Sequence, residues 1–242
     1  GFSPLERSWE NVHSEYRPRV TAETTKSELW EILTEMLDEL NDEHVKLYRD
    51  GEFFVSGSGK AEQAASEFDL ELIANDYLTD LGSTNNYILY GKIAEKENVG
   101  YIFIAAFLDE NSEVIGSVLQ QLDYRNLDAL IIDIRTSIGG YDGLAAEYSS
   151  YFSDGQHHVY NSQYKNGPDR NNFTQQKAFY THQPGAINFT KPIILLADAA
   201  TASEAEIFTL NMRSYTHVTQ IGDTTAGALS TVGPARFLAN GW

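Results

Sequence analysis

The hydrophobic pattern divides the chain into two parts that differ in kind. Up to about Leu81 the sequence is charged, and its apolar residues recur at helical spacing. Over Leu29–Leu40 they fall on one stripe, which predicts an amphipathic helix with that stripe buried. Thr25 and Glu28 have the spacing of a capping box at its start. A second helix is predicted over Lys60–Leu78.

After about Asn86 the pattern changes to short apolar runs separated by helical stretches. Nearly continuous apolar runs suit strands that are buried on both faces, and alternation of strands with helices predicts an α/β core. The polar stretch Gly155–Asn188 is predicted to form a long excursion or hairpin. The predicted strands are Tyr87–Tyr90, Tyr101–Phe107, Ala129–Ile134 and Pro192–Ala197, and the predicted helices are Ser112–Leu122, Tyr141–Phe152 and Ala202–Ser214.

These patterns divide the 242 residues into a helical N-terminal subdomain, residues 1–81, and an α/β core, residues 82–242. No apolar run approaches the ~18 residues that a membrane-spanning helix needs, so no membrane span is predicted. The sequence starts at Gly1 rather than Met, so an export signal could have been removed, and the start of the sequence leaves the compartment open.

Composition narrows the chemistry. Lys and Arg number 17 against 35 Asp and Glu, which gives a net charge of −18. Such a surface repels phosphate backbones, so we do not expect nucleic acid as a partner. The chain has no cysteine, which excludes disulfides, thiolate metal sites and a cysteine nucleophile. The adjacent pair His157 and His158 would point to opposite faces of a strand, and no metal or cofactor is expected.

A serine stands where a helix is predicted to begin after a strand. In the segment Thr201–Phe208, Ser203 falls in the first turn, where backbone N–H groups are free and the helix dipole favours negative charge. Both features help to bind an oxyanion beside the hydroxyl. Read alone, a serine at this position is more often a helix cap, with Glu204 and Glu206 complementing the dipole.

A diglycine follows the most apolar strand. Asp133–Gly140 ends in Gly139 and Gly140, which can adopt positive φ and aim their amides at a ligand, as an oxyanion hole requires. Read alone, the segment could be a simple strand-to-helix turn. The pattern of a phosphate-binding loop is missing.

A histidine follows the first amphipathic helix. His44 lies within Leu40–Leu47, just before a predicted strand. A lone histidine is more often structural than catalytic, so His44 gains meaning only together with the other two segments.

Taken together and in this order, the segments resemble the C-terminal-processing (tail-specific) family of serine peptidases, which includes the tricorn core protease. Each motif is soft by itself, but their order and spacing make the signal specific. The matching stretches run from about Trp9 to Ala228. They are Leu40–His44 ("L-x-D-x-H"), Gly100–Phe107 ("GYI-x-I-x-x-F"), Leu130–Arg135 with Gly139-Gly140, Lys191–Leu196 with Thr201–Glu206, and Gly222–Gly227.

The resemblance implies the roles of the site residues. The family places its nucleophile three residues before a glutamate, which gives Ser203 before Glu206, the latter structural or orienting. It implies an oxyanion hole from the backbone N–H of Glu204 and of Gly139 or Gly140, with the choice between the glycines left open. It also implies a ClpP/crotonase-like α/β core.

The two branches of the family activate the serine with different bases. The tail-specific branch uses a lysine that would align with Ala228, and no lysine occurs from Ser203 to Trp242. The tricorn-like branch uses a histidine, which His44 matches, and a free imidazole is partly neutral at pH 7. That branch orients its histidine with a downstream glutamate, which we expect beyond Trp242, so the core would lack its C-terminal end here. Asp42, Asp133 and Asp223 are the other acidic residues that could orient His44.

Two further expectations concern partners and place. Only 55 residues separate His44 from Gly100, too few for a PDZ insert of about 80–90 residues, so none is expected. The resemblance implies a serine endopeptidase that acts on polypeptides, exported to the periplasm or cell envelope. The alternative is a non-catalytic module that binds hydrophobic ligands or peptides on the same fold. Substrate, cleavage specificity and oligomeric state are left open.

Overall fold

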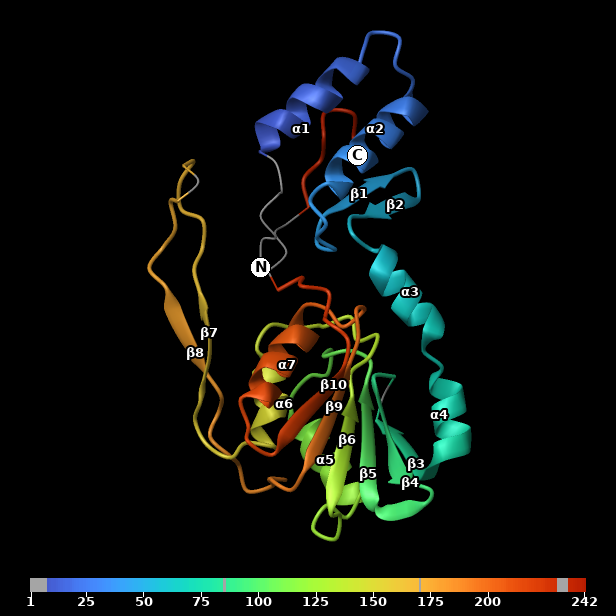
Figure 1. Cartoon of the computed structure of the whole chain (residues 1–242), viewed down its shortest axis with the longest axis vertical. Helices are drawn as coiled ribbons and strands as arrows, with labels where there is room; N and C mark the ends of the chain where they lie inside the picture. The colour runs from blue at the N-terminus through green and yellow to red at the C-terminus, as the bar shows by residue number, and fades with distance from the viewer. Residues whose placement is uncertain (1–7, 85, 170, 230–234) are drawn as a thin grey trace.

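The computed structural model describes residues 8–84, 86–169, 171–229 and 235–242. A six-stranded sheet forms the centre, with a helical N-terminal part above it and a two-stranded arm at one side (Figure 1). The helices are α1 (Trp9–Tyr16), the 3-10 turn Arg17–Arg19, α2 (Lys26–Asp38), α3 (Gly59–Glu67), α4 (Leu70–Tyr77), α5 (Glu113–Gln121), α6 (Leu144–Ser150) and α7 (Glu204–Arg213). The strands are β1 (Lys46–Arg49), β2 (Glu52–Val55), β3 (Leu78–Thr84), β4 (Ile88–Ile93), β5 (Lys96–Ile104), β6 (Ala129–Asp133), β7 (His158–Ser162), β8 (Lys177–Tyr180), β9 (Ile193–Ala197) and β10 (Val218–Gly222).

The central sheet has the order β10-β9-β6-β5-β4-β3. The strands from β5 to β10 in this sheet run parallel, and β3 and β4 form an antiparallel edge. The mixed α/β architecture expected from the sequence is confirmed, as are the four predicted strands in β4, β5, β6 and β9. The carboxyl ends of β6 and β9 are neighbours, so the loops that follow them meet at one edge of the sheet.

Alternation along the strands separates two cores. On β5, Ile102 and Ile104 face the main core, in which α5, α6 and α7 pack against the sheet. Tyr101 and Phe103 face the other side, where they pack with Phe68 and with α4. The ring of Phe68 stacks on Phe103 at 5.4 Å between centroids. This two-sided burial explains why the second half of β5, Val99–Ile104, and nearly all of β6 lack polar side chains.

The prediction of one continuous helix over Lys60–Leu78 is wrong. This stretch forms two helices, α3 and α4, which are separated at Phe68 and Asp69. Phe68 is extended and packs on the sheet, while the Asp69 side chain accepts a hydrogen bond from the Leu72 N–H and starts a new helix. Asp is a strong N-cap residue, and this local signal outweighs the continuing helical pattern.

The N-terminal part presents the histidine loop. Helix α2 begins with the predicted capping box between Thr25 and Glu28, and Ile32 packs with Val12 and Tyr16 from α1. The chain then turns through residues 39–45 into the β1–β2 hairpin. The arm is the hairpin of β7 and β8, so the predicted excursion is confirmed. The division at residue 81 stays a prediction, and β3, the first strand of the central sheet, begins at Leu78.

The last residues return to the N-terminal part. Trp242 packs edge-on against Trp30 of α2, with ring centroids 5.6 Å apart. The guanidinium of Arg49 lies over both rings, at 4.6 Å from Trp30 and 5.5 Å from Trp242. The Arg49 head also donates to Glu52 and to the Lys26 carbonyl. Trp242 thereby packs against the part of the chain that carries His44.

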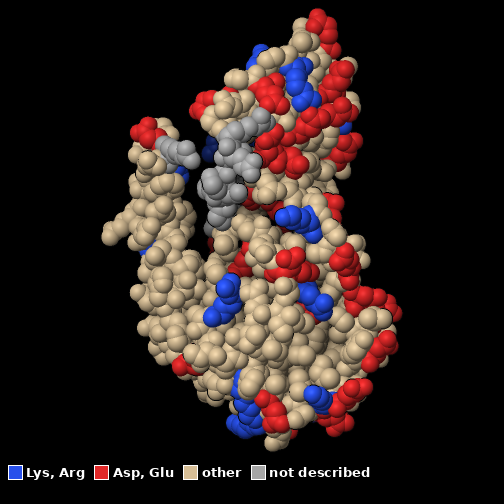
Figure 2. Space-filling model, viewed as in Figure 1, with Lys and Arg blue, Asp and Glu red and all other residues tan. Residues whose placement is uncertain are grey.

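Acidic side chains gather over the N-terminal helices and along the side formed by α3 and α4, whereas the arm and the central face are largely uncharged (Figure 2). Among the residues that the structure describes, no helix combines the length and the apolarity needed to cross a membrane.

Candidate active site

Ser203 occupies a strained turn between β9 and α7. It is the N-cap of α7, with φ 57° and ψ −123°. A non-glycine residue rarely adopts a positive φ, and such strain persists only where surrounding contacts impose it. A strand, a sharp turn at a strained serine and a helix form the arrangement by which hydrolases expose a nucleophilic hydroxyl. The structure thus places Ser203 in a backbone setting that a simple helix cap does not require.

Hydrogen bonds tie the loop after β9 to the loop after β6. Thr136, itself at φ 61°, donates its N–H to Asp198 Oδ1 at 3.0 Å. The Thr201 hydroxyl donates to the Ile134 carbonyl at 3.0 Å. The Ala202 N–H donates to the Ser137 carbonyl at 3.0 Å. These bonds hold the serine turn and the diglycine loop together as one unit.

Gly139 lies directly against the serine turn. It has φ 83°, and a Cβ added to it would lie 2.7 Å from the Ser203 Cβ and 2.7 Å from the Glu204 nitrogen. Gly140 packs elsewhere, because its added Cβ would overlap the Phe107 carbonyl oxygen. Both positions therefore require glycine for close approach, but only Gly139 requires it toward the nucleophile.

Three backbone donors surround this contact. Within the residues described, the N–H groups of Gly139, Gly140 and Glu204 have no hydrogen-bond acceptor. For Glu204 this follows from its place at the first position of α7, where intrahelical acceptors do not exist. The positive end of the α7 dipole lies at the same point. The arrangement can stabilise negative charge that develops beside Ser203.

Glu206 connects Ser203 to the turn after β10. Its Oε2 accepts the Ser203 N–H at 3.2 Å. Its Oε1 accepts the Thr225 hydroxyl and the Gly227 N–H, each at 2.7 Å. The Glu206 side chain is 3% exposed, so these bonds compensate a buried carboxylate.

His44 lies in the loop between α2 and β1, partly buried and with no hydrogen bond to Ser203 among the described residues. Burial lowers the pKa of His44, while the charges of Asp42 and Glu206 raise it. The buried Nδ1 of His44 has no hydrogen-bond partner in the described structure, and Asp42 Oδ1 lies 3.9 Å away.

Asp133 is engaged elsewhere. It is fully buried, accepts from the Tyr101 hydroxyl at 2.8 Å and pairs with Arg135 at 2.6 Å. The Arg135 guanidinium also lies 4.9 Å from the ring centroid of Phe68. Of the three acidic residues considered from the sequence, Asp42 is the one that lies beside the histidine ring.

Comparisons with known proteins identify the family of the chain. The sequence model of peptidase family S41 matches residues 98–242, which is more than half of the chain. The chain belongs to peptidase family S41. The α/β core and the C-terminal-processing resemblance expected from the sequence are confirmed at the level of family.

Two curated proteins and one solved structure are similar to this S41 chain. It is 26% identical over 139 residues to the carboxy-terminal processing protease CtpB of Bacillus subtilis and 27% identical over 130 residues to CtpA. These matches cover 56% and 54% of this chain and 26% of each relative, so the chain spans about a quarter of their length. A crystal structure of a Parabacteroides merdae protein described as a peptidase is also similar. The match covers all of this chain and 75% of the Parabacteroides chain, with a TM-score of 0.82 and 24% identity. That likeness shows the fold.

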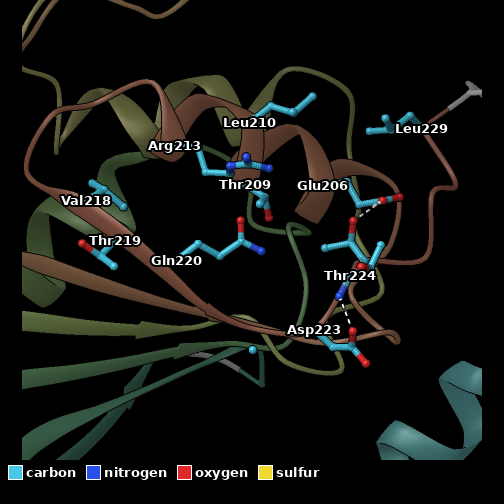
Figure 3. A pocket seen from close by; sticks show the side chains of 12 residues that line it. Glu206, Thr209, Leu210, Arg213, Val218, Thr219, Gln220, Asp223, Thr224 and Leu229 are labelled. Carbon is cyan, nitrogen blue, oxygen red and sulfur yellow. Dashed lines mark hydrogen bonds between the residues drawn. The ribbon is translucent and has the colours of Figure 1, made fainter.

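An open hollow of about 680 Å³ adjoins the site in this S41 chain. Figure 3 shows Glu206, Thr209 and Arg213 lining it from α7, opposite Thr219 and Gln220 of β10. Its lining is mainly polar, and it reaches the nucleophile turn through Glu206, which binds the Ser203 N–H.

Sequence reasoning missed two parts of the site. The bonds from Asp198 and Thr201 that fix the diglycine loop gave no signal, because these are ordinary polar residues 62 and 67 positions from their partners. The Glu204 side chain was noted only for its charge near the dipole. It caps α6 instead, a role that no spacing rule within one helix can reveal.

Proposed function

We propose that this chain is a serine endopeptidase in which Ser203 is the nucleophile and His44 its base. The observation that carries the proposal is the strained Ser203, whose turn lies against Gly139 and whose neighbouring amides have no acceptor in the described residues. A hydroxyl needs a base to become a nucleophile, and His44 is the residue that matches the histidine base of the tricorn-like branch.

The proposed reaction follows from these positions. Ser203 Oγ attacks the carbonyl carbon of the scissile peptide bond, and the His44 ring takes the hydroxyl proton. The N–H groups of Glu204 and of the diglycine bind the oxyanion, with the contact at Ser203 favouring Gly139. His44 then returns the proton to the departing amine, and water hydrolyses the acyl-enzyme by the reverse roles. Closing of the His44 loop onto Ser203 would accompany substrate binding, since catalytic hydrogen bonds are often long without substrate.

Labelling with a fluorophosphonate probe tests the proposal, because the probe reacts with an activated serine. We expect the wild type to be labelled and to hydrolyse a denatured protein substrate, and S203A to do neither while keeping the same unfolding temperature. Labelling that survives in S203A contradicts the proposal. An unlabelled, folded wild type that binds apolar ligands or peptides would instead favour the non-catalytic module. The substrate sequence and an exported location stay predictions from the sequence.

A further inference from the structure

Helix α6 begins without a cap of its own. The residue before it, Gly143, has φ 91° and no side chain to accept the first N–H groups. Such groups need a partner when they lie in the interior. They find it on the neighbouring helix: Glu204 Oε1 accepts the Gly143 N–H at 2.9 Å and the Ala145 N–H at 3.0 Å. A carboxylate from α7 therefore caps α6.

The Glu204 carboxylate is buried, although glutamate is normally found at the protein surface. It is 6% exposed, and burial raises its pKa, while the bonds from Gly143 and Ala145 lower it. Burying a carboxylate is costly unless it is hydrogen-bonded, and the charge-assisted bonds at a helix N-terminus supply that compensation. If α6 needed a cap only for stability, a Ser or Asp at position 143 could supply it locally. Here the cap comes from the residue next to the nucleophile.

This location links the two sides of the oxyanion site. The backbone N–H of Glu204 is one of its donors, and the side chain of Glu204 holds the segment that starts three residues after Gly140. Gly139 lies between them, in contact with the Glu204 nitrogen. We propose that Glu204 is a positioning residue, whose side chain keeps the diglycine amides in register with Ser203. The inference rests on the proposed function, because such register matters only if Ser203 reacts.

The reaction is sensitive to this kind of displacement. Removal of one oxyanion donor in serine proteases lowers kcat by roughly 10²–10³-fold, and small misplacements of reacting groups have comparable effects. Loss of the Glu204 acceptor should displace the diglycine loop without removing a donor, so we expect kcat to fall by roughly 10–100-fold. KM should change little, because the side chain is buried and does not face the substrate.

A pair of substitutions separates the hydrogen bonds from the charge. E204M keeps the approximate volume but removes the acceptor, and it leaves the N–H groups of Gly143 and Ala145 without a partner. E204Q keeps an amide oxygen in the place of Oε1 and should retain kcat within roughly fivefold, because neutral hydrogen bonds are weaker but still position the loop. E147A is the matched control, since Glu147 is an exposed acidic residue in the first turn of α6.

The experiment measures fluorophosphonate labelling rates, kcat and KM for the wild type, S203A, E204M, E204Q and E147A, at a temperature where thermal unfolding shows all of them folded. Slow labelling in E204M with rescue in E204Q supports the inference. Equal rates in E204M and the wild type overturn it, while the proposed function stands if S203A is unlabelled. If the wild type itself is not labelled, the proposed function fails. Amide exchange over residues 139–145 then tests the positioning role of Glu204 separately: faster exchange in E204M but not in E147A supports that role, and unchanged exchange overturns it.

Discussion

Glu206 holds the backbone of Ser203 through its carboxylate, because Oε2 accepts the Ser203 N–H at 3.2 Å while Oε1 accepts from Thr225 and Gly227. One buried side chain thus fixes the strained nucleophile turn and the turn after β10. The carboxylate suits this role because it is an acceptor on both oxygens, and all three of its partners are donors.

The first prediction concerns E206Q. The amide has one acceptor oxygen and a donor NH₂ group, so at least one partner N–H or hydroxyl would face a donor in the buried site. We expect a loss of about 1–3 kcal/mol in the free energy of unfolding, together with slower labelling of Ser203. Chemical denaturation of E206Q measures the first effect. E113Q provides the control, because Glu113 lies in the first turn of α5 and is exposed. Equal stability of E206Q and E113Q would contradict the assigned role.

The second prediction concerns pH. Burial lowers the pKa of His44 from 6.5, so the ring is neutral, and able to act as base, at every pH above that value. Activity should therefore persist down to pH 6.5 and fall only at lower pH, as the ring becomes protonated. The same shift makes folding less favourable as pH falls below 6.5, since the unfolded chain takes up the proton first. A profile of kcat/KM against pH checks this, with H158Q as the control at an exposed histidine. An acid limb above pH 6.5 would exclude His44 as the base.

The third prediction concerns Asp42. Its charge raises the pKa of His44, and its Oδ1 lies 3.9 Å from the unpartnered Nδ1. D42N removes the charge but keeps an oxygen for the His44 N–H, which Asp42 accepts at 2.9 Å. The acid limb of the pH profile should therefore move to lower pH. We expect kcat to fall only roughly tenfold, because the long Nδ1–Oδ1 distance makes Asp42 a weaker orienting group than a hydrogen-bonded triad carboxylate.

The neighbouring E43Q is the control for Asp42. It removes an equal charge one residue from His44, on a side chain whose own pKa is raised by burial and by Glu206. If Asp42 acts through its contact with Nδ1, E43Q leaves kcat unchanged. Equal losses in D42N and E43Q would show that the loop tolerates no change and that Asp42 has no specific role.

Much of this fold follows from local sequence signals. The capping box of α2, the two-sided apolar strands β5, β6 and β9, and the polar excursion of the arm all depend on nearest neighbours along the chain, which periodicity and turn chemistry reveal. The break at Asp69 was missed because two local signals compete there, helix continuation and a new N-cap. The outer strands β3 and β10 are partly exposed and interrupted by polar residues, so apolar runs do not mark them.

The site follows from sequence only in part. Motif order placed Ser203 and the diglycine in one site, and the contact between Gly139 and Ser203 supports that placement. It could not choose between Gly139 and Gly140, because their difference lies in what a Cβ would meet in three dimensions. Nor could it find Glu204 as the cap of α6, since that contact joins residues 59 and 61 positions apart on helices that meet only after folding.

The last prediction concerns G139A. At φ 83° an alanine is strained, and its Cβ would lie 2.7 Å from both the Ser203 Cβ and the Glu204 nitrogen. The methyl group must therefore displace the serine turn or the diglycine loop, and either movement separates the hydroxyl from the amides. G51A is the matched control, because Gly51 has a similar φ of 86° and nothing within 4 Å of an added Cβ. Both variants should lose about 1 kcal/mol of stability from the backbone strain alone. G139A should in addition lose labelling of Ser203 by roughly 10²-fold or more, measured as the rate of reaction with the fluorophosphonate, because the donors no longer face the hydroxyl. G139A and G51A with the same labelling rate would place the oxyanion site away from the contact between Gly139 and Ser203.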